Sequence, residues 1–146
     1  MRASFAWGES PPHILVVDDE PQIRDLLRTT LEREGYRVTV RSEAAAALAD
    51  VHEGGISILI SDLKMPRMSG LELLQAAKAV QPDLGSILIT GYASTETAVE
   101  ALRFGADDFI TKPFSLQDLR RVVDRVLSER RMLTQERDAL DLAREE

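Results

Sequence analysis

The sequence predicts a doubly wound α/β fold with a five-stranded parallel sheet and helices on both faces. Five short apolar or β-branched runs alternate with segments of helical periodicity: 13–17, 36–40, 56–60, 86–90 and 108–111. The first, third and fourth runs are almost continuously apolar, which is typical of strands covered on both faces, whereas 36–40 alternates like an edge strand. Right-handed helical crossovers then favour the strand order 2-1-3-4-5.

Helix boundaries follow from local signals along the chain. The first helix begins at Pro21, ends before Gly35, and carries an apolar stripe that consists of Ile23, Leu26, Leu27, Thr30 and Leu31. The second is an alanine-rich segment, 43–52, with Ser42 as its expected N-cap and the glycine pair 54–55 as its end.

The remaining three helices follow the third, fourth and fifth strands. The third begins after residues 69–70 and ends at Pro82, with an inner stripe of Leu71, Leu74 and Ala77. The fourth covers 95–104, with Ser94 before it and Gly105 after it. The fifth opens at Ser115, which stands three residues before Asp118 in a loose capping pattern, and its inner residues are Leu119, Val122, Val123 and Val126.

Composition narrows the classes of function. The 146 residues suit one domain with tails, and we expect a flexible lead-in at 1–12, a folded domain at 13–127 and a helical extension at 128–146. The absence of cysteine excludes disulfides and thiolate metal sites and favours a cytoplasmic location. A net charge of -7 argues against direct contact with nucleic acid or an anionic membrane, and no apolar run approaches the length of a membrane span.

Carboxylates stand where this fold places its ligands. Open α/β sheets bind ligands at the carboxyl ends of the strands, at the switch point between the first and third strands. Asp18 and Asp19 follow the first strand and Asp62 follows the third, so three aspartates are expected to converge. Their mutual repulsion calls for a cation, and an all-oxygen site with room for water and phosphate favours Mg²⁺.

Two further side chains complete this predicted site. Thr90 ends the fourth strand and Lys112 follows the fifth, so a hydroxyl and an ammonium are available to phosphoryl oxygens. Because a carboxylate can form an acyl phosphate, the pattern predicts a phosphoryl-transfer site. Each residue alone has an ordinary explanation as a turn, strand or surface residue, but their coincidence at four strand ends favours the functional interpretation.

Four strings in this order resemble the signatures of response-regulator receiver domains, the CheY-like, flavodoxin-like modules of bacterial two-component systems: LVVDDEP, LISDLKMPRMSGLELL, ILITGYAS and ADDFITKPF. The resemblance implies that Asp62 is phosphorylated and that Asp19, Asp62 and the backbone carbonyl of Lys64 bind Mg²⁺. It also implies that Asp18 supports the ion through water, and that Lys112 precedes a cis peptide bond.

The same resemblance implies how the domain signals. Thr90 and Lys112 would bind the phosphoryl group, and Phe109 would move inward with Thr90, changing the face formed by the fourth helix, fifth strand and fifth helix. A sensor histidine kinase is the implied phosphodonor, and a missing or separate output domain is the implied target. The sequence of these strings most resembles receivers of nitrogen-regulation (NtrC-like) transcriptional activators, and this resemblance implies a role in transcription regulation.

The C-terminal extension leaves its role open. Leu119, Val126, Leu133 and Leu140 recur every seven residues, as in one seam of a coiled coil, but the companion positions Glu129 and Glu136 are unsuited to a seam. The segment is therefore interpreted as a weak dimerising helix, a frayed helix or a linker. A homodimer would use this helix together with the switching face.

Three classes of function compete for these residues. A flavin-binding electron carrier needs a phosphate loop where this chain has acidic residues after its first strand, and an aspartate phosphatase needs a second aspartate two residues after its nucleophile on that strand. A docking module that is never phosphorylated is not favoured, because every expected site residue is present. A phosphorylated switch, rather than an enzyme acting on a separate substrate, agrees best with the residues.

Overall fold

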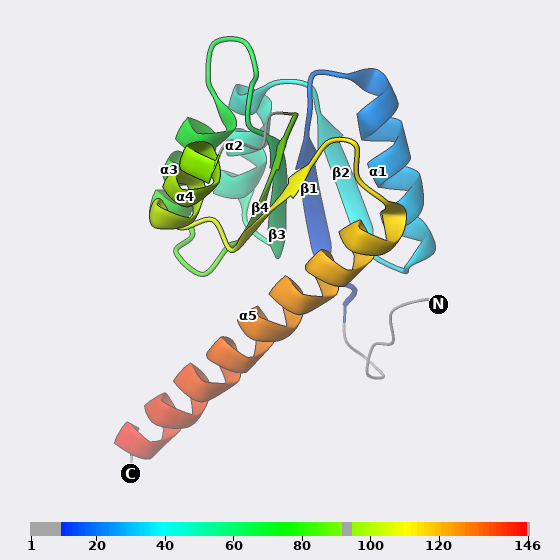
Figure 1. Ribbon diagram of the computed structural model, residues 1–146. Helices are drawn as coiled ribbons and strands as arrows, with labels where there is room; N and C mark the ends of the chain where they lie inside the picture. Colours follow the sequence, from blue (N-terminus) through cyan, green and yellow to red (C-terminus); the bar gives the residue numbers. More distant parts are fainter. Residues whose placement is uncertain (1–9, 92–94, 146) are drawn as a thin grey trace.

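The computed structural model describes residues 10–91 and 95–145, and it has the predicted doubly wound architecture (Figure 1). Strands and helices alternate along the chain as β1(His13–Val17), α1(Pro21–Arg33), β2(Arg37–Arg41), α2(Ala44–Glu53), β3(Ile58–Asp62), α3(Gly70–Val80), β4(Gly85–Thr90), α4(Thr95–Arg103), β5(Asp108–Thr111) and α5(Leu116–Glu145). The five strands are parallel and ordered β2-β1-β3-β4-β5, which confirms the predicted sheet.

The core divides into layers on the two faces of the sheet. Alternate residues of β1 point to opposite sides: Ile14 and Val16 pack with α1 and α5, whereas Leu15 and Val17 pack with α2 and α3. A third apolar cluster joins Leu74, Leu88, Ala101 and Ala106 from α3, β4 and the α4 region. Every residue of β3 and β4 is buried, as their apolar sequences predict.

The starts of α2 and α3 and the buried face of α3 differ in places from the sequence predictions. Ser42 was the expected cap of α2, but the N-cap is Glu43, which makes no side-chain capping bond. At α3, Ser69 and Glu72 form a reciprocal capping box that the sequence analysis missed. The buried stripe of α3 uses Leu73 in place of the predicted Leu71, which is half-buried against the third cluster.

Helix α5 has two parts with different surroundings. Leu119 and Val126 are fully buried in the core, but Leu133 and Leu140, one and two heptads further on, are 57% and 60% exposed. At 30 residues, α5 is about 45 Å long and extends well beyond the sheet (Figure 1). The predicted heptad row is therefore shared between the domain core and an exposed segment.

Charged pairs fix the direction of α5 where it leaves the domain. Arg130 donates two hydrogen bonds to Asp107, at 2.8 and 2.7 Å, and Arg125 donates one to Asp108 at 2.6 Å. Asp107 also accepts a hydrogen bond from the backbone N–H of Ser86 at the start of β4. These bonds attach α5 to the first residues of β4 and β5, at the end of the sheet opposite the predicted site.

Some predictions fall outside the described residues. Only the last three residues of the predicted lead-in are described, and the expected cap of α4, Ser94, is not. Among the helices within residues 10–91 and 95–145, none is both long enough and apolar enough to cross a bilayer.

Candidate functional site

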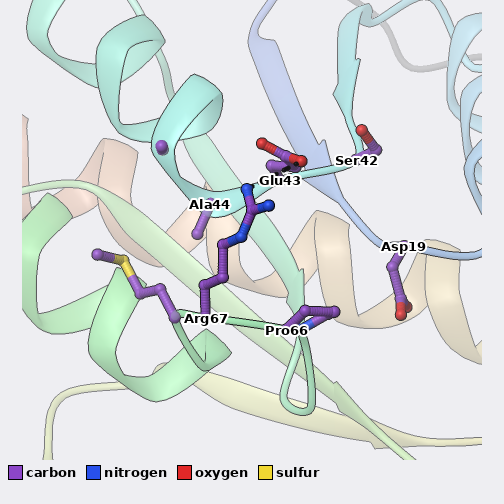
Figure 2. A pocket seen from close by; sticks show the side chains of 8 residues that line it. Asp19, Ser42, Glu43, Ala44, Pro66 and Arg67 are labelled. Carbon is purple, nitrogen blue, oxygen red and sulfur yellow. Dashed lines mark ion pairs between the residues drawn. The ribbon is translucent and has the colours of Figure 1, made fainter.

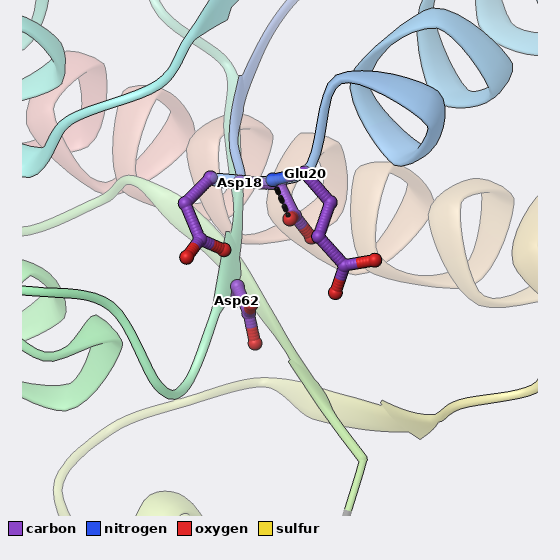
Figure 3. A group of neighbouring side chains, drawn as sticks. Asp18, Glu20 and Asp62 are labelled. Carbon is purple, nitrogen blue, oxygen red and sulfur yellow. Dashed lines mark hydrogen bonds between the residues drawn. The ribbon is translucent and has the colours of Figure 1, made fainter.

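Four carboxylates meet where β1 and β3 end. These strands are neighbours with Val17 opposite Ser61, so the residues that follow Val17 lie beside Asp62. Oxygens of Asp18, Asp19, Glu20 and Asp62 all lie within 4.8 Å of one another. Figure 3 labels three of these residues, Asp18, Glu20 and Asp62, whose side chains gather at the ends of the two strands. The structure thus brings the three predicted aspartates together and adds Glu20.

Asp18 and Asp62 are the buried members of this cluster, with 0% and 6% of their surfaces exposed. One carboxylate oxygen of Asp18, Oδ1, accepts a hydrogen bond from the Glu20 N–H at 2.9 Å, and Oδ1 of Asp62 accepts one from the Lys64 N–H at 3.4 Å. The second oxygen of Asp18, Oδ2, is buried and accepts no hydrogen bond from the described residues. A buried carboxylate oxygen without a hydrogen bond is costly, and binding of a cation nearby would reduce that cost.

Lys112 reaches this cluster from the end of β5. Its ammonium nitrogen lies 3.1 Å from Glu20 Oε1, 3.3 Å from Asp18 Oδ2 and 3.4 Å from Asp62 Oδ2. The contact with Asp18 is an ion pair by distance without the alignment of a hydrogen bond, so Oδ2 is only partly compensated. One lysine therefore faces a surplus of negative charge.

Burial and the neighbouring charges shift the pKa values of the two buried aspartates and of Lys112. Burial raises the pKa of Asp18, and the Glu20 N–H and Lys112 only partly oppose the shift. Burial also raises the pKa of Asp62, with a second contribution from the charge of Asp18. For Lys112, burial works against the charged form, but the neighbouring carboxylates outweigh it and raise its pKa. Without a further cation, both buried aspartates are therefore protonated more easily than an exposed aspartate.

The donor set fits a small divalent cation. All the available side-chain ligands are carboxylate oxygens, which suit Mg²⁺, and the partly uncompensated Oδ2 of Asp18 provides an acceptor that an ion or its water could use. Asp19 is exposed beside Asp18, so incoming ligands can reach it from solvent. Lys64 follows Asp62 by two residues, as its predicted role as a carbonyl ligand requires.

Thr90 and Phe109 occupy different surroundings. Thr90 is the buried last residue of β4, and its carbonyl accepts a hydrogen bond from the Lys112 N–H at 2.8 Å, which ties the two strand ends together. Phe109 is half-buried in β5 and packs against the cluster that contains Leu88 and Ala101. The Lys112-Pro113 peptide is cis, as expected.

Glu20 and Gly70 are the site residues that the sequence analysis missed. Glu20 was visible as the third acid of the run after β1, but its contact with Lys112 depends on a fold that brings residues 92 positions apart together. Gly70, the buried first residue of α3, backs directly onto the main chain of Asp62. In the sequence, Gly70 only marks the start of a helix.

A hollow of about 480 Å³ opens beside the acids (Figure 2). Asp19 stands at one edge, and the Arg67 side chain reaches Glu43, with 3.5 Å between guanidinium and carboxylate. Arg67 has a φ of 72°, a left-handed conformation that costs an arginine about 1–2 kcal/mol. Asp19 is the member of the acidic cluster that lines this hollow, so the hollow adjoins the cluster on the side of α2.

Comparison with known proteins gives a consistent result. The family model described as "Response regulator receiver domain" matches residues 14–124. The C4-dicarboxylate transport transcriptional regulatory protein DctD of Rhizobium meliloti is 37% identical over 86% of this chain, and the nitrogen assimilation regulatory protein NtrX of Azorhizobium caulinodans is 37% identical over 88%. This chain covers 27% and 29% of those two proteins, so it spans less than a third of their length.

Solved structures agree with these relatives. The receiver domain of NtrX from Brucella abortus is 40% identical with a TM-score of 0.75, and the match covers 79% of this chain and 98% of that one. The beryllofluoride-activated NtrC4 receiver domain dimer is 33% identical with a TM-score of 0.78, and the match covers 81% of this chain and 98% of that one. The similarity therefore covers nearly the whole of each receiver domain.

Proposed function

Because this chain belongs to the response-regulator receiver family, we propose that it accepts a phosphoryl group on Asp62 from a sensor histidine kinase in a Mg²⁺-dependent reaction. A receiver domain is a signalling module rather than an enzyme with a separate substrate. The observation that carries the proposal is the position of Asp62, a buried carboxylate 3.4 Å from Lys112 and within 4.8 Å of three other acids.

In the proposed reaction, a carboxylate oxygen of Asp62 attacks phosphorus as the bond to the donor nitrogen breaks, which leaves an acyl phosphate and the histidine. Bound Mg²⁺ would supply the charge neutralisation that this transfer requires. Asp19, Asp62 and the Lys64 carbonyl would hold the ion, and Asp18 would support it through water. The raised pKa values of Asp18 and Asp62 give the reason for an ion here, because they show how poorly the chain alone neutralises these acids.

Lys112 and Thr90 would bind the phosphoryl oxygens once the bond has formed. Lys112 has three carboxylate partners within 3.4 Å, so it can exchange a carboxylate for a phosphoryl oxygen without leaving the site. Thr90 is the last residue of β4, the strand next to that of Asp62, so it lies at the same edge of the sheet as the proposed phosphoacceptor. Phosphorylation would then favour one of two arrangements of Thr90 and Phe109.

The proposed output surface is the face formed by α4, β5 and α5. Three apolar residues of and after α4 are 45–47% exposed: Val99, Leu102 and Phe104. Their exposure and the packing of Phe109 beside Ala101 support a surface that changes with the switch. The relatives are transcriptional regulators, so we extend the proposal to control of transcription in the cytoplasm through an output domain or a separate partner.

A homodimer would use the same face together with the exposed part of α5. Beyond the core, four large apolar side chains among the described residues of α5 are 57–66% exposed: Met132, Leu133, Leu140 and Leu142. The related NtrC4 receiver domain is a dimer in its beryllofluoride-activated form, which supports dimerisation as a form of output. In this proposal, residues 13–127 are the receiver and 128–146 are its dimerising or linking extension.

Labelling with a small phosphodonor tests the proposed function. Acetyl phosphate and Mg²⁺ should add one phosphoryl group to the intact protein, and peptide mapping should place it on Asp62. Asp62→Asn should remain unlabelled, whereas Asp50→Asn, which alters an exposed ion pair with Arg41, should label normally. Stoichiometric labelling of Asp62→Asn, or labelling of the original protein without a divalent ion, would contradict the proposal.

A further inference from the structure

Gly70 lies against the main chain of the proposed nucleophile. A Cβ atom built on Gly70 would overlap the carbonyl oxygen of Asp62, and it would lie 2.9 Å from the Asp62 carbonyl carbon and 3.0 Å from the Leu63 Cα. All three neighbours are backbone atoms, so none can turn aside as a side chain would. Any side chain at this position must displace either the start of α3 or the end of β3.

Hydrogen bonds hold the two segments in this contact. The Gly70 N–H donates to the Leu63 carbonyl at 2.9 Å, and the Leu63 N–H donates to the Ile89 carbonyl of β4 at 2.7 Å. At α3, the Ser69 hydroxyl accepts from the Glu72 N–H at 3.1 Å, which fixes the first helical turn. The end of β3 is thus held between its neighbour in the sheet and the first turn of α3.

We infer that Gly70 is a positioning residue for phosphoryl transfer: its lack of a side chain lets α3 fix the main chain of Asp62 where the carboxylate can react. This inference rests on the proposed function of Asp62. The carboxylate has little tolerance for movement, because its contacts with the Lys64 N–H and Lys112 Nζ are both already 3.4 Å. A displacement of 1 Å in a reacting group can slow a reaction about a hundredfold.

Gly70→Ala tests this role, and Gly85→Ala provides the matched control. Gly85 is also buried, and its added Cβ would lie 2.6 Å from Ile58 Cγ1 and 3.1 Å from Val126 Cγ1, but at the opposite end of β3 and β4. Both substitutions should lower the melting temperature. The initial rate of labelling by acetyl phosphate should fall about tenfold to a hundredfold for Gly70→Ala. For Gly85→Ala it should stay within about twofold of the original rate, as expected for a remote change.

Two further measurements separate positioning from loss of fold. Crystal structures of both variants should show the Asp62 Oδ2 to Lys112 Nζ distance lengthened from 3.4 Å in Gly70→Ala and unchanged in Gly85→Ala. If Gly70→Ala does not fold, Ser69→Ala replaces it as the test. This variant is expected to fold, because it removes one capping bond without adding a clash. That variant loosens the first turn of α3, and its labelling should slow about threefold, the equivalent of a cap worth about 0.7 kcal/mol.

The outcomes distinguish this inference from the proposed function. Labelling of the original protein at Asp62 together with an undiminished rate in folded Gly70→Ala would overturn the positioning role and leave the proposed function intact. Equal slowing of the Gly70 and Gly85 variants would also overturn it, since general destabilisation would then explain the effect. If the original protein is never labelled, the proposed function fails, and an unmoved Asp62 carboxylate in the Gly70→Ala crystal would separately refute the positioning role.

Discussion

Replacing Asp62 by asparagine should stabilise the metal-free protein even as it removes the phosphoacceptor. Asn has nearly the same shape as Asp, so the main change is the loss of a buried negative charge. Asp62 is 6% exposed, and burial and Asp18 both raise its pKa, which means that the folded state disfavours its ionised form. A neutral side chain avoids that penalty.

The size of the gain follows from competing charges around Asp62. At an effective dielectric constant of 20, attraction to Lys112 across 3.4 Å amounts to about 5 kcal/mol, and repulsion from an acid at 4.8 Å amounts to about 3.5 kcal/mol. Asp18 is buried and contributes such a repulsion. Desolvation of ionised Asp62 costs several kcal/mol more, so both effects destabilise the folded state. After solvent screening of the exposed acids, we expect a net stabilisation of about 1–2 kcal/mol.

The pH dependence has a definite sign. Because folding raises the pKa of Asp62, its ionised form destabilises the protein at neutral pH. As the pH falls through the raised pKa, the folded state takes up a proton first and the penalty disappears. The advantage of Asp62→Asn should therefore be largest near pH 7 and should shrink as the pH approaches the ordinary aspartate pKa. Added Mg²⁺ should reverse the order, because it binds and stabilises the original site more strongly.

Urea unfolding in EDTA at several pH values measures this difference. Asp107→Asn is the control: Asp107 accepts two hydrogen bonds from Arg130 and one from the Ser86 N–H, so losing its charge should destabilise the protein. If Asp62→Asn proves no more stable than the original protein in EDTA at pH 7, the reasoning about uncompensated acids is wrong. A stabilisation that persists unchanged at low pH would contradict the assignment of the effect to ionised Asp62.

Three other substitutions have expected outcomes. Arg67→Gly should raise the free energy of unfolding by about 0.5–1 kcal/mol in urea titrations. Removing the backbone strain at φ 72° stabilises the folded state by more than the extra conformational entropy of glycine stabilises the unfolded state, and the lost ion pair with Glu43 is exposed and weak. Arg130→Ala should lower it by about 1–3 kcal/mol, because Asp107 loses two charge-assisted bonds; an unchanged value would mean that α5 is not held there. Glu20→Gln should weaken Mg²⁺ binding about fivefold in calorimetric titrations. This factor corresponds to about 1 kcal/mol, the attraction in water between one exposed carboxylate and a unit positive charge about 4 Å away. An unaltered affinity would show that Glu20 does not lie beside the ion.

The sequence predicted the sheet well because its signals are local and strong. Apolar runs such as those of β3 and β4 suit strands covered on both sides, and the right-handed crossover rule leaves few arrangements for five of them. Once the order is known, the residues after β1 and β3 must meet at the switch point. The convergence of Asp18, Asp19 and Asp62 is therefore a consequence of topology.

Features that depend on tertiary packing were predicted less well. The inner stripe of α3 includes Leu73 in place of Leu71, because the direction in which a helix docks decides which of two neighbouring leucines is covered. Heptad spacing in α5 could not show that Val126 is in the core while Leu133 is exposed, since the change occurs where the sheet ends. Gly70 gave no chemical signal, because its contribution is the space that a side chain would fill.

A crystal structure with Mg²⁺ and beryllofluoride tests directly whether Asp62 is a magnesium-dependent phosphoacceptor. One magnesium ion should be bound by Asp19, Asp62 and the Lys64 carbonyl, with beryllofluoride attached to a carboxylate oxygen of Asp62 and contacted by Lys112 and Thr90. A beryllofluoride group on another residue, or magnesium bound away from Asp62, would contradict that role of Asp62.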